Sequence, residues 1–440
     1  MTKFLSRLDR GSPRAQGGSL VEHVQILRRV SRVTVALIRP LVVRTVAVSD
    51  PDDLLARLPD AAPYAWIRHG EGLVGWGEAA RAAVPPGPGR FDWARGWLSS
   101  LFAGALIEDE VGVPGSGPVA FGSFTFDGDA QGTVLVVPRV VLARRDGRAW
   151  LTTIGDSAFD LVTPPRGPGR IRYADGSLTA AQWEHRVARA VRRIKEDSLL
   201  DKVVLARDLT AVAERDIDPR VLLGRLAERY PECYTFSVDG LVGATPELLV
   251  RHTGQAVESL VLAGTTARGG GAADDAARAA ALYASEKDRH EHACAVASVR
   301  EALTPLCSEL HVPDEPELLV LPNVQHLASR VTGRLSDGAS VLDVVAAMHP
   351  TAAVGGTPTR AALGVIRELE GMDRAGYAGP VGWIDSRGDG EWGIALRCAY
   401  VSGRRARLFA GCGIMAGSDP AAELAEAQAK LRVMRYALEG

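Results

Sequence analysis

A glycine-rich run that leads directly into a helix start, at residues 411–430, constrains the fold more than any other segment. Gly411–Gly417 contains three glycines in seven residues, so backbone N–H groups can approach a ligand closely there. Ser418 or Asp419, followed by Pro420, is typical of a helix N-cap and first turn. Because the N-terminus of a helix attracts anions, the segment predicts an anion-binding turn that opens a helix.

The predicted helix carries its charged side chains on one face. Glu423 and Glu426 lie three residues apart and Lys430 lies one turn further on, so two carboxylates and an ammonium project the same way. An acidic pair beside an anion site suggests a bridging divalent cation. A surface helix with solvated charges would show the same pattern, so the segment alone leaves both interpretations open.

A second acidic pair lies in Ser285–His292, inside a predicted helix. Asp288 and Glu291 repeat the three-residue spacing, so two helices could each offer a carboxylate pair to one cation. Hard oxygen ligands suit Mg²⁺. His290 and His292 are about 200° apart on a helix and cannot chelate one ion. A solvated face laced with ion pairs is the alternative.

Two further residues are candidates for proton transfer. Lys202 opens the apolar run Lys202–Arg207, where the period of a strand places it on one face with Val204. A lysine on a buried face is unusual unless it is paired or catalytic, and burial lowers its pKa toward that of a general base. Glu247 follows a tight turn and can donate a proton from a fixed position. An edge lysine in solvent and an exposed turn glutamate are the alternatives.

Three other segments offer polar groups to a ligand. His349 lies in a glycine- and proline-rich joint between two predicted helices, and Leu262–Gly269 runs from a strand into a glycine-framed turn. Tyr377 and Arg397 are plausible anion binders, the arginine through a bidentate fork to a carboxylate. A helix stop at His349 and surface positions for the tyrosine and arginine are the alternatives.

Composition points to a soluble protein with a small-molecule ligand. The 440 residues carry a net charge of −2, which gives no electrostatic reason to expect nucleic acid or an anionic membrane as partner. The five cysteines are scattered without C-x-x-C spacing, which favours a reducing compartment and argues against structural zinc. Charges throughout the first 48 residues exclude a signal peptide or membrane span there, so we expect a cytoplasmic protein.

Apolar patterning predicts three parts. Residues 1–33 are a flexible N-terminal extension, residues 34–170 a strand-rich subdomain, and residues 171–440 the catalytic region, although the last two can interleave. Trp183, Val187, Val191 and Ile194 recur at helical spacing. Other predicted elements are a hairpin over Trp66–Trp76, helices over Asp274–Leu303, Val341–Met348, Thr357–Leu369 and Pro420–Leu438, and a strand over Gly393–Val401.

Together these segments resemble the chorismate-utilising enzymes, which include isochorismate synthase, salicylate synthase and the large subunits of anthranilate and aminodeoxychorismate synthase. The resemblance covers Trp183–Leu438, with eight landmarks in family order. They are Lys-Val-Val-Leu-Ala-Arg at 202, Thr-Pro-Glu-Leu at 245, Leu-Ala-Gly-Thr at 262, Ser-Glu-Lys-Asp-Arg-His-Glu-His at 285, Val-Gln-His-Leu at 324, His-Pro-Thr at 349, Gly-Trp-Ile-Asp at 382 and Gly-x-Gly-Ile through Ser-Asp-Pro at 411. The resemblance implies an α/β (α+β) fold with two large facing antiparallel sheets and helices packed outside.

The resemblance also implies Mg²⁺ as cofactor and chorismate as substrate. Glu291 and Glu426 would bind the metal, with Asp288 and Glu423 reaching it directly or through water. Lys202 would activate water for attack at ring C2, and Glu247 would protonate the departing C4 hydroxyl. The implied substrate-binding residues are Gly264, Thr265, His349, Tyr377, Arg397, Gly411, Gly413 and Lys430.

Few positions distinguish members of the family. Ammonia-using members commonly carry Gln where this chain has Lys202, so we expect water as nucleophile and no glutaminase subunit. Ala263 occupies the position of a nucleophilic lysine in aminodeoxychorismate synthases. Thr266 and Ala352 depart from the family, many members having Arg and Pro there.

The resemblance leaves the product and the pathway open. Salicylate synthase is the main alternative, but several of those enzymes replace the His-Pro-Thr segment present at His349, which favours isochorismate as product. A catalytically inactive relative that binds chorismate is an alternative of another class. We expect a monomer that serves menaquinone or siderophore biosynthesis.

Overall fold

The computed structural model describes residues 40–59, 63–156, 162–197, 199–320 and 324–440. Leu41–Gly440 cluster as one unit, and the account below concerns that unit. The extension predicted at residues 1–33 lies outside the described residues. None of the described helices is long and apolar enough to span a membrane.

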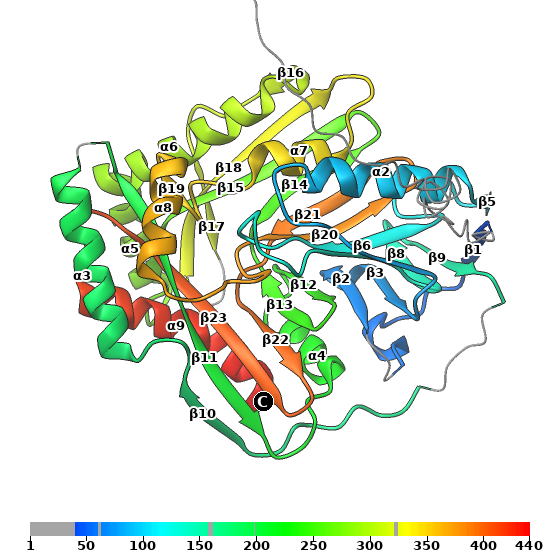
Figure 1. Cartoon of the computed structure of the whole chain (residues 1–440), viewed down its shortest axis with the longest axis horizontal. Coiled ribbons are helices and arrows are strands. Elements are labelled where there is room, and N and C mark those ends of the chain that lie inside the picture. The colour runs from blue at the N-terminus through cyan, green and yellow to red at the C-terminus, as the bar shows by residue number, and fades with distance from the viewer. Residues whose placement is uncertain (1–39, 60–62, 157–161, 198, 321–323) are drawn as a thin grey trace, which may run out of the picture. The chain divides into compact units, whose positions relative to one another are not determined.

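Two large sheets form the unit (Figure 1). The larger sheet has 13 strands within the described residues. They are β1 (Val42–Val48), β2 (Tyr64–Arg68), β3 (Glu71–Trp76), β5 (Leu106–Asp109), β8 (Val140–Arg145), β9 (Arg148–Ile154), β10 (Ile171–Asp175), β11 (Lys202–Ala213), β12 (Tyr234–Val238), β13 (Leu241–Thr245), β19 (Gly356–Thr357), β22 (Cys398–Ser402) and β23 (Arg405–Ile414). Their spatial order is β10-β11-β23-β22-β13-β12-β2-β3-β8-β9-β1-β5, with β19 paired to β11.

The smaller sheet has ten strands among the described residues, in the order β16-β18-β15-β14-β21-β20-β6-β7-β4 with β17 paired to β18. They are β4 (Ala80–Ala83), β6 (Val119–Ser123), β7 (Val134–Val137), β14 (Leu248–Thr253), β15 (Ala256–Ala267), β16 (Cys307–His311), β17 (Glu317–Val320), β18 (Val324–Leu335), β20 (Pro380–Asp385) and β21 (Gly390–Ile394). The pairing of β1 with β5 is parallel. The other strand pairs of the described chain are antiparallel, as for β11 with β23 and β15 with β18.

Buried side chains join the two sheets face to face. Trp66 in β2 of the larger sheet donates its indole N–H to Glu391 in β21 of the smaller sheet, at 2.7 Å. Arg145 in β8 pairs with the same carboxylate at 2.5 Å. The rings of Tyr64 in β2 and Phe121 in β6 lie 5.8 Å apart. These contacts confirm the expected fold of two facing antiparallel sheets.

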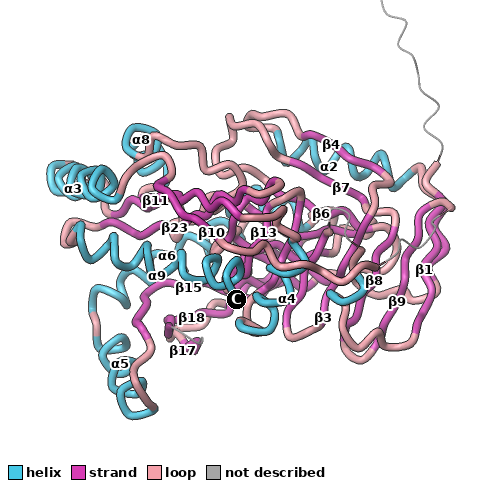
Figure 2. Tube along the Cα trace, turned by 90° about the horizontal axis from the view of Figure 1, so that it is seen from below, coloured by secondary structure: helices cyan, strands magenta, loops and turns pink. Residues whose placement is uncertain are grey.

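Helices cover the sheets and gather toward one end. They are α2 (Arg90–Ala103), α3 (Ala180–Glu196), α4 (Pro219–Arg229), α5 (Ala272–Ala284), α6 (Glu286–Leu303), α7 (Val341–Met348), α8 (Thr359–Leu369) and α9 (Pro420–Glu439), with a short 3₁₀ helix, η1, at Leu55–Arg57. Helix α6 packs on β15, α9 on β23 and α8 on β11. Figure 2 shows most helices at the end that holds these strands, whereas β1, β8 and β9 lie at the other end.

Helix α3 has the amphipathic pattern that its sequence predicts. Trp183, Val187, Val191 and Ile194 are all buried. Thr179 and Gln182 form a capping box at the start of the helix. The indole N–H of Trp183 donates to the carbonyl of Ala206 at 3.0 Å, which fixes α3 against β11.

Both sheets continue across the expected boundary at residue 170. Strand β12 pairs with β2 in the larger sheet, and β20 pairs with β6 in the smaller one. The strand-rich region before residue 170 therefore extends the same two sheets that carry the later region.

Two predicted elements are each broken in two. The helix predicted over Asp274–Leu303 is α5 followed by α6, because Ser285 has an extended backbone (φ −72°, ψ 108°) and accepts the N–H of Asp288 as a new N-cap. The strand predicted over Gly393–Val401 is β21 followed by β22, with Arg397 between them at φ +48°. Neither break contains a proline or a glycine, so nothing in the composition marks where the predicted element ends.

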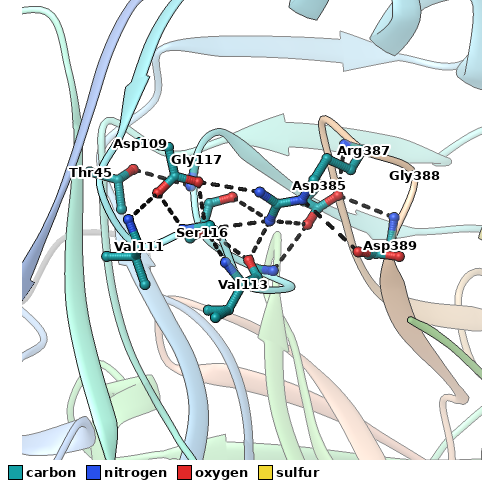
Figure 3. Close-up of polar contacts among 12 residues, drawn as sticks. Thr45, Asp109, Val111, Val113, Ser116, Gly117, Asp385, Arg387, Gly388 and Asp389 are labelled. Carbon is teal, nitrogen blue, oxygen red and sulfur yellow. Dashed lines mark hydrogen bonds and ion pairs between the residues drawn. The ribbon is translucent and has the colours of Figure 1, made fainter. Parts of the chain in front are cut away.

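A polar network ties the chain after β5 to the turn between β20 and β21 (Figure 3). Arg387 donates to the backbone carbonyls of Val113 and Ser116 and pairs with Asp385 at 2.9 Å and Asp109 at 3.3 Å. Because Asp385 is buried, it requires such donors to remain charged. Its carboxylate also accepts the N–H of Gly115 at 3.0 Å. The network therefore joins the larger sheet to the smaller one away from the helical end.

Candidate active site

Two neighbouring crossings carry the chain between the sheets. Pro246 and Glu247 connect β13 of the larger sheet to β14 of the smaller one, and Ala395–Arg397 connects β21 back to β22. Backbone hydrogen bonds tie the crossings together, from Ala244 N–H to the Arg397 carbonyl (3.2 Å) and from Ile394 N–H to the Glu247 carbonyl (3.1 Å). Glu247 and Arg397 are therefore held side by side where the sheets meet.

A cavity of about 260 Å³ lies at these crossings. Its walls come from β11, β15, β23, α6 and α9 as well as from the crossings. Thirteen of the fourteen site residues predicted from the sequence line it: Lys202, Glu247, Gly264, Thr265, Asp288, Glu291, Tyr377, Arg397, Gly411, Gly413, Glu423, Glu426 and Lys430. The structure thus brings them together, while their individual roles stay predictions.

His349 is the exception, because it lines a separate cavity and not this one, so its predicted part in substrate binding stays a prediction without a place at this site. Its Nε2 lies 3.0 Å from the carbonyl of Phe126, and its ring meets the Phe126 ring edge to face at 5.9 Å. Burial lowers the pKa of His349 to about 3, so the ring is neutral and Nε2 donates this bond. His349 ends α7, and the residues that reach the cavity are Ala353 and Val354, further along the same joint.

Lys202 begins β11 with its side chain toward the cavity, as the strand periodicity predicts. Its ammonium donates to Glu291 on α6 at 2.5 Å, and the two side chains are 12% and 22% exposed. The facing strand β23 has Gly413 opposite Val204. A Cβ atom at Gly413 would lie 2.6 Å from Cε of Lys202, so the glycine leaves room for the lysine side chain.

Glu247 is buried, and its carboxyl group is protonated to a substantial fraction at neutral pH. Burial raises the pKa of its carboxyl group to about 7, against the opposing positive charges of Lys202, Lys430 and Arg397. Its backbone N–H donates to Thr245 Oγ1 at 3.2 Å, which fixes the turn. A carboxyl group that is protonated near neutral pH and faces a cavity can act as a general acid.

Four carboxylates reach the cavity from two helices. Asp288 and Glu291 lie on α6, and Glu423 and Glu426 lie on α9. Asp419 caps α9 by accepting the N–H of Ala422 at 2.9 Å, and Pro420 follows it, as the sequence predicts.

The α9 carboxylates have defined partners. Ser418 donates to Glu423 at 2.7 Å. Lys430 pairs with Glu426 at 2.7 Å and donates to the Gly411 carbonyl at 2.8 Å. The sulfur of Cys412 and the carboxylate oxygens of Glu423 and Glu426 lie within 4.8 Å of one another.

This donor set fits a divalent cation. Four carboxylates give the hard oxygen ligands that Mg²⁺ prefers. Cys412 is a poor ligand in its present state, because burial strongly raises the pKa of its thiol. Of the four carboxylates, Glu423 and Glu426 on α9 already lie close enough to share an ion. Asp288 and Glu291 on α6 stand outside that close group, and Glu291 is paired with Lys202.

Gly264 lets β15 approach α6 at the cavity. It has φ +74° at a break in the register between Ala263 and Thr265. A Cβ atom there would lie 3.3 Å from Cβ of Asp288. Glycine is therefore required both for the backbone conformation and for the close approach of Asp288.

Tyr377 and Arg397 form the end of the cavity near β23. Tyr377 is buried and stacks on Phe409 with ring centroids 5.2 Å apart. The guanidinium of Arg397 donates to the sulfur of Cys233 at 3.9 Å. Arg397 pairs with no carboxylate among the residues that the structure describes. An arginine directed into a cavity without an acidic partner suits an anionic ligand.

Sequence reasoning gave no role to two polar residues that line the cavity, His326 and Lys287. His326 shares a hydrogen bond of 2.8 Å between its Nδ1 and Thr265 Oγ1, while its Nε2 is buried and has no partner among the described residues. Burial lowers the pKa of His326 to about 3, so its ring is neutral. Their positions in the sequence could have identified them, because His326 lies in the landmark Val-Gln-His-Leu and Lys287 lies next to the predicted ligand Asp288.

Comparison with known proteins agrees with this geometry. A profile of the family described as chorismate binding enzyme matches residues 164–439. The isochorismate synthase MenF of Bacillus subtilis is 36% identical over 355 residues, which cover 74% of this chain and 75% of that protein. The salicylate biosynthesis isochorismate synthase of Pseudomonas aeruginosa is 42% identical over 279 residues, covering 62% of this chain and 58% of that protein.

Solved structures agree as well. MenF of Escherichia coli, described as a menaquinone-specific isochorismate synthase, superimposes with a TM-score of 0.77 at 25% identity, covering 94% of this chain and 98% of that one. The shared fold extends beyond the region that the family profile matches. This chain therefore belongs to the family of chorismate-binding enzymes.

Proposed function

We propose that this protein is a Mg²⁺-dependent isochorismate synthase, which converts chorismate to isochorismate. The observation that carries the proposal is the joint presence of Lys202 and Glu247 in one cavity, the latter with a pKa of about 7. The names of the relatives support the same reaction.

The proposed chemistry needs one base and one acid. As a free amine, after the ammonium paired with Glu291 has released its proton, Lys202 accepts a proton from water as the water oxygen bonds to ring C2. Glu247 donates its proton to the C4 hydroxyl as that C–O bond breaks and the double bond shifts. One water enters and one leaves, so substrate and product are isomers. Each proton transfer contributes ~10²- to 10⁴-fold to the rate, because water is a poor nucleophile and hydroxide a poor leaving group.

Glu291 and Glu426 would hold Mg²⁺, with Asp288 and Glu423 beside them. When bound, the cation would neutralise the ring carboxylate of the substrate. Arg397, Tyr377 and Lys430 would bind the substrate at the other end of the cavity, together with the backbone at Gly264, Thr265, Gly411 and Gly413.

Incubation with chorismate and Mg²⁺, followed by separation of isochorismate, salicylate and pyruvate, tests the proposal. We expect isochorismate to accumulate and chelation of the metal to stop its formation. Salicylate and pyruvate formed faster than isochorismate decays unaided would instead identify a salicylate synthase, which uses the same base and acid. Chorismate bound but left unchanged would identify a non-catalytic relative. Added ammonium should give no aromatic amine, because a lysine at position 202 indicates water, and not ammonia, as the nucleophile.

The pathway and the assembly are further parts of the proposal. Relatives are named for menaquinone and for salicylate biosynthesis, so we propose a role in menaquinone or siderophore formation. We propose a cytoplasmic monomer without a glutaminase subunit. The five cysteines support a reducing compartment, because all of them are free thiols.

A further inference from the structure

Lysine is rare in this chain, and most of its lysines lie at the cavity. Of the 51 basic residues only five are lysines, namely Lys3, Lys195, Lys202, Lys287 and Lys430. Three of these five line the cavity. An ammonium is a compact charge on a flexible stem. Lys202 and Lys430 have places in the proposed function, whereas Lys287 has none.

The position of Lys287 in its helix gives no local reason for a cation. Ser285 is the N-cap of α6 and Lys287 is its second residue. The N-terminus of a helix carries partial positive charge, so a lysine there is disfavoured. Its neighbours Glu286 and Asp288 follow the usual preference for acidic residues in the first turn. The lysine therefore needs an explanation outside helix stability.

The other two lysines of the cavity are held by partners, and Lys287 is not. Lys202 is bound to Glu291, and Lys430 is bound to Glu426. Lys287 is exposed and makes no hydrogen bond or ion pair with the residues that the structure describes. The charge of Lys287 nevertheless acts on Glu423 of α9. Burial raises the pKa of Glu423, and the positive charge of Lys287 is one of the causes that lower it.

The carboxylates of the cavity give the ammonium of Lys287 a role in attracting an anion. Four carboxylates line the cavity and repel an approaching anion. Two of them are neutralised by contact with lysines, and Lys287 remains available at the edge. We propose that Lys287 binds a carboxylate of the incoming anionic substrate and holds it as the substrate enters the cavity. The inference rests on the proposed function, in which that substrate is the dicarboxylate chorismate.

Steady-state kinetics of Lys287→Met and Lys287→Arg test this role. For Lys287→Met we expect KM for chorismate to rise about tenfold with kcat within about twofold of the wild type, because the charge acts on substrate capture. The dependence of kcat/KM on ionic strength should become shallower. Lys287→Arg keeps the charge and should restore most of the loss. Lys195→Met removes the same charge from an exposed position on α3 and should leave KM unchanged.

A binding measurement separates this inference from the proposed function. In a Lys202→Met background, which cannot turn over, calorimetric titration with chorismate and Mg²⁺ should give a dissociation constant about tenfold higher when Lys287→Met is added. A wild-type enzyme that leaves chorismate unchanged contradicts the proposed function. A wild-type enzyme that converts chorismate, with Lys287→Met matching it in KM, affinity and salt dependence, overturns the role of Lys287. A loss of kcat with a lower thermal midpoint and no recovery in Lys287→Arg overturns it as well, because that pattern is structural.

Discussion

Burial and pairing act differently on the two proposed catalytic residues. Glu247 lies in a buried turn, where burial holds its pKa near 7 despite three positive charges nearby. Lys202 lies closer to solvent and meets a carboxylate on another helix. The same cavity thus brings the titration of an acid close to neutral pH and holds the proposed base in place through an ion pair.

Replacement of Lys202 tests the base directly. Lys202→Met should lower kcat by ~10²- to 10⁴-fold, because it removes the proposed general base. Binding of chorismate with Mg²⁺ should persist, as measured by calorimetry. Turnover at the wild-type rate would remove Lys202 from the mechanism.

The acid predicts a pH dependence of the rate. Glu247 donates a proton only while protonated, so kcat should fall as pH rises through about 7. Glu247→Gln should lower kcat by ~10²- to 10⁴-fold and remove this limb of the profile. A pH–rate profile of both proteins checks the assignment. An unchanged alkaline limb in the glutamine variant would assign the titration to another group.

The same shift predicts a pH dependence of stability. The pKa of Glu247 is raised in the folded protein from an ordinary value of 4.5. Its contribution to stability is therefore complete below about pH 4.5 and is lost as pH rises through about 7. Relative to Glu247→Gln, the wild type should lose about 3 kcal/mol of unfolding free energy across this range. Urea unfolding of the two proteins at pH 5 and pH 8.5 measures the difference, and parallel stabilities would contradict it.

At the scale of elements, Gly413 of strand β23 leaves the space that the side chain of Lys202 on β11 occupies. Gly413→Ala should push Cε of Lys202 aside, because the added Cβ would lie 2.6 Å from it. The displaced group is the end of a flexible side chain, so we expect kcat to fall at least tenfold while stability changes by less than about 1 kcal/mol. Activity and thermal unfolding measure the two effects.

Gly417→Ala is the matched control for this change. It lies in the same glycine-rich segment, and a Cβ atom there meets nothing within 4 Å. Its activity should equal that of the wild type. Equal losses in the two variants would show that the segment, and not the room for Lys202, matters.

Helices whose apolar residues recur at regular spacing were predictable from the sequence. Breaks between elements that depend on contacts elsewhere in the fold were not. The helices at Val341–Met348 and Pro420–Glu439 begin where the sequence predicts, because an apolar face and a cap agree there. The crossing at Arg397 has no such local signal, and the N-cap signal of Ser285 with Asp288 lies inside a run that also fits a continuous helix. A serine inside a charged helix and an arginine after an apolar run each fit the uninterrupted element equally well.

The site shows the same division. The family resemblance found thirteen residues that converge on one cavity, although their segments are far apart in the chain. It placed His349 there too, because sequence proximity to Ala353 and Val354 cannot show which way a side chain turns. Lys287 and His326 were missed because the sequence does not show which polar atoms are left without a partner: the ammonium of Lys287 and Nε2 of His326, among the described residues.

At the scale of the whole molecule, the two sheets make the catalytic region dependent on the chain before it. The family profile begins at residue 164, yet β12 and β20 pair with strands that precede that point. A fragment of residues 164–440 would expose two long sheet edges and the buried partners of Trp66. We expect it to aggregate, as size-exclusion chromatography would show. A monomeric, active fragment would contradict this view of the fold.

The tied crossings at Glu247 and Arg397 also bear on the design of inhibitors. Two backbone hydrogen bonds fix these segments to each other, so the spacing of the two side-chain anchors is set before any ligand arrives. A flexible ligand that offers a carboxylate to Arg397 and a proton acceptor to Glu247 must lose conformational entropy to match that spacing, whereas a rigid cyclic one has little to lose. The affinity of inhibitors for this enzyme should therefore depend more on the rigidity of the inhibitor than on the number of its charged groups.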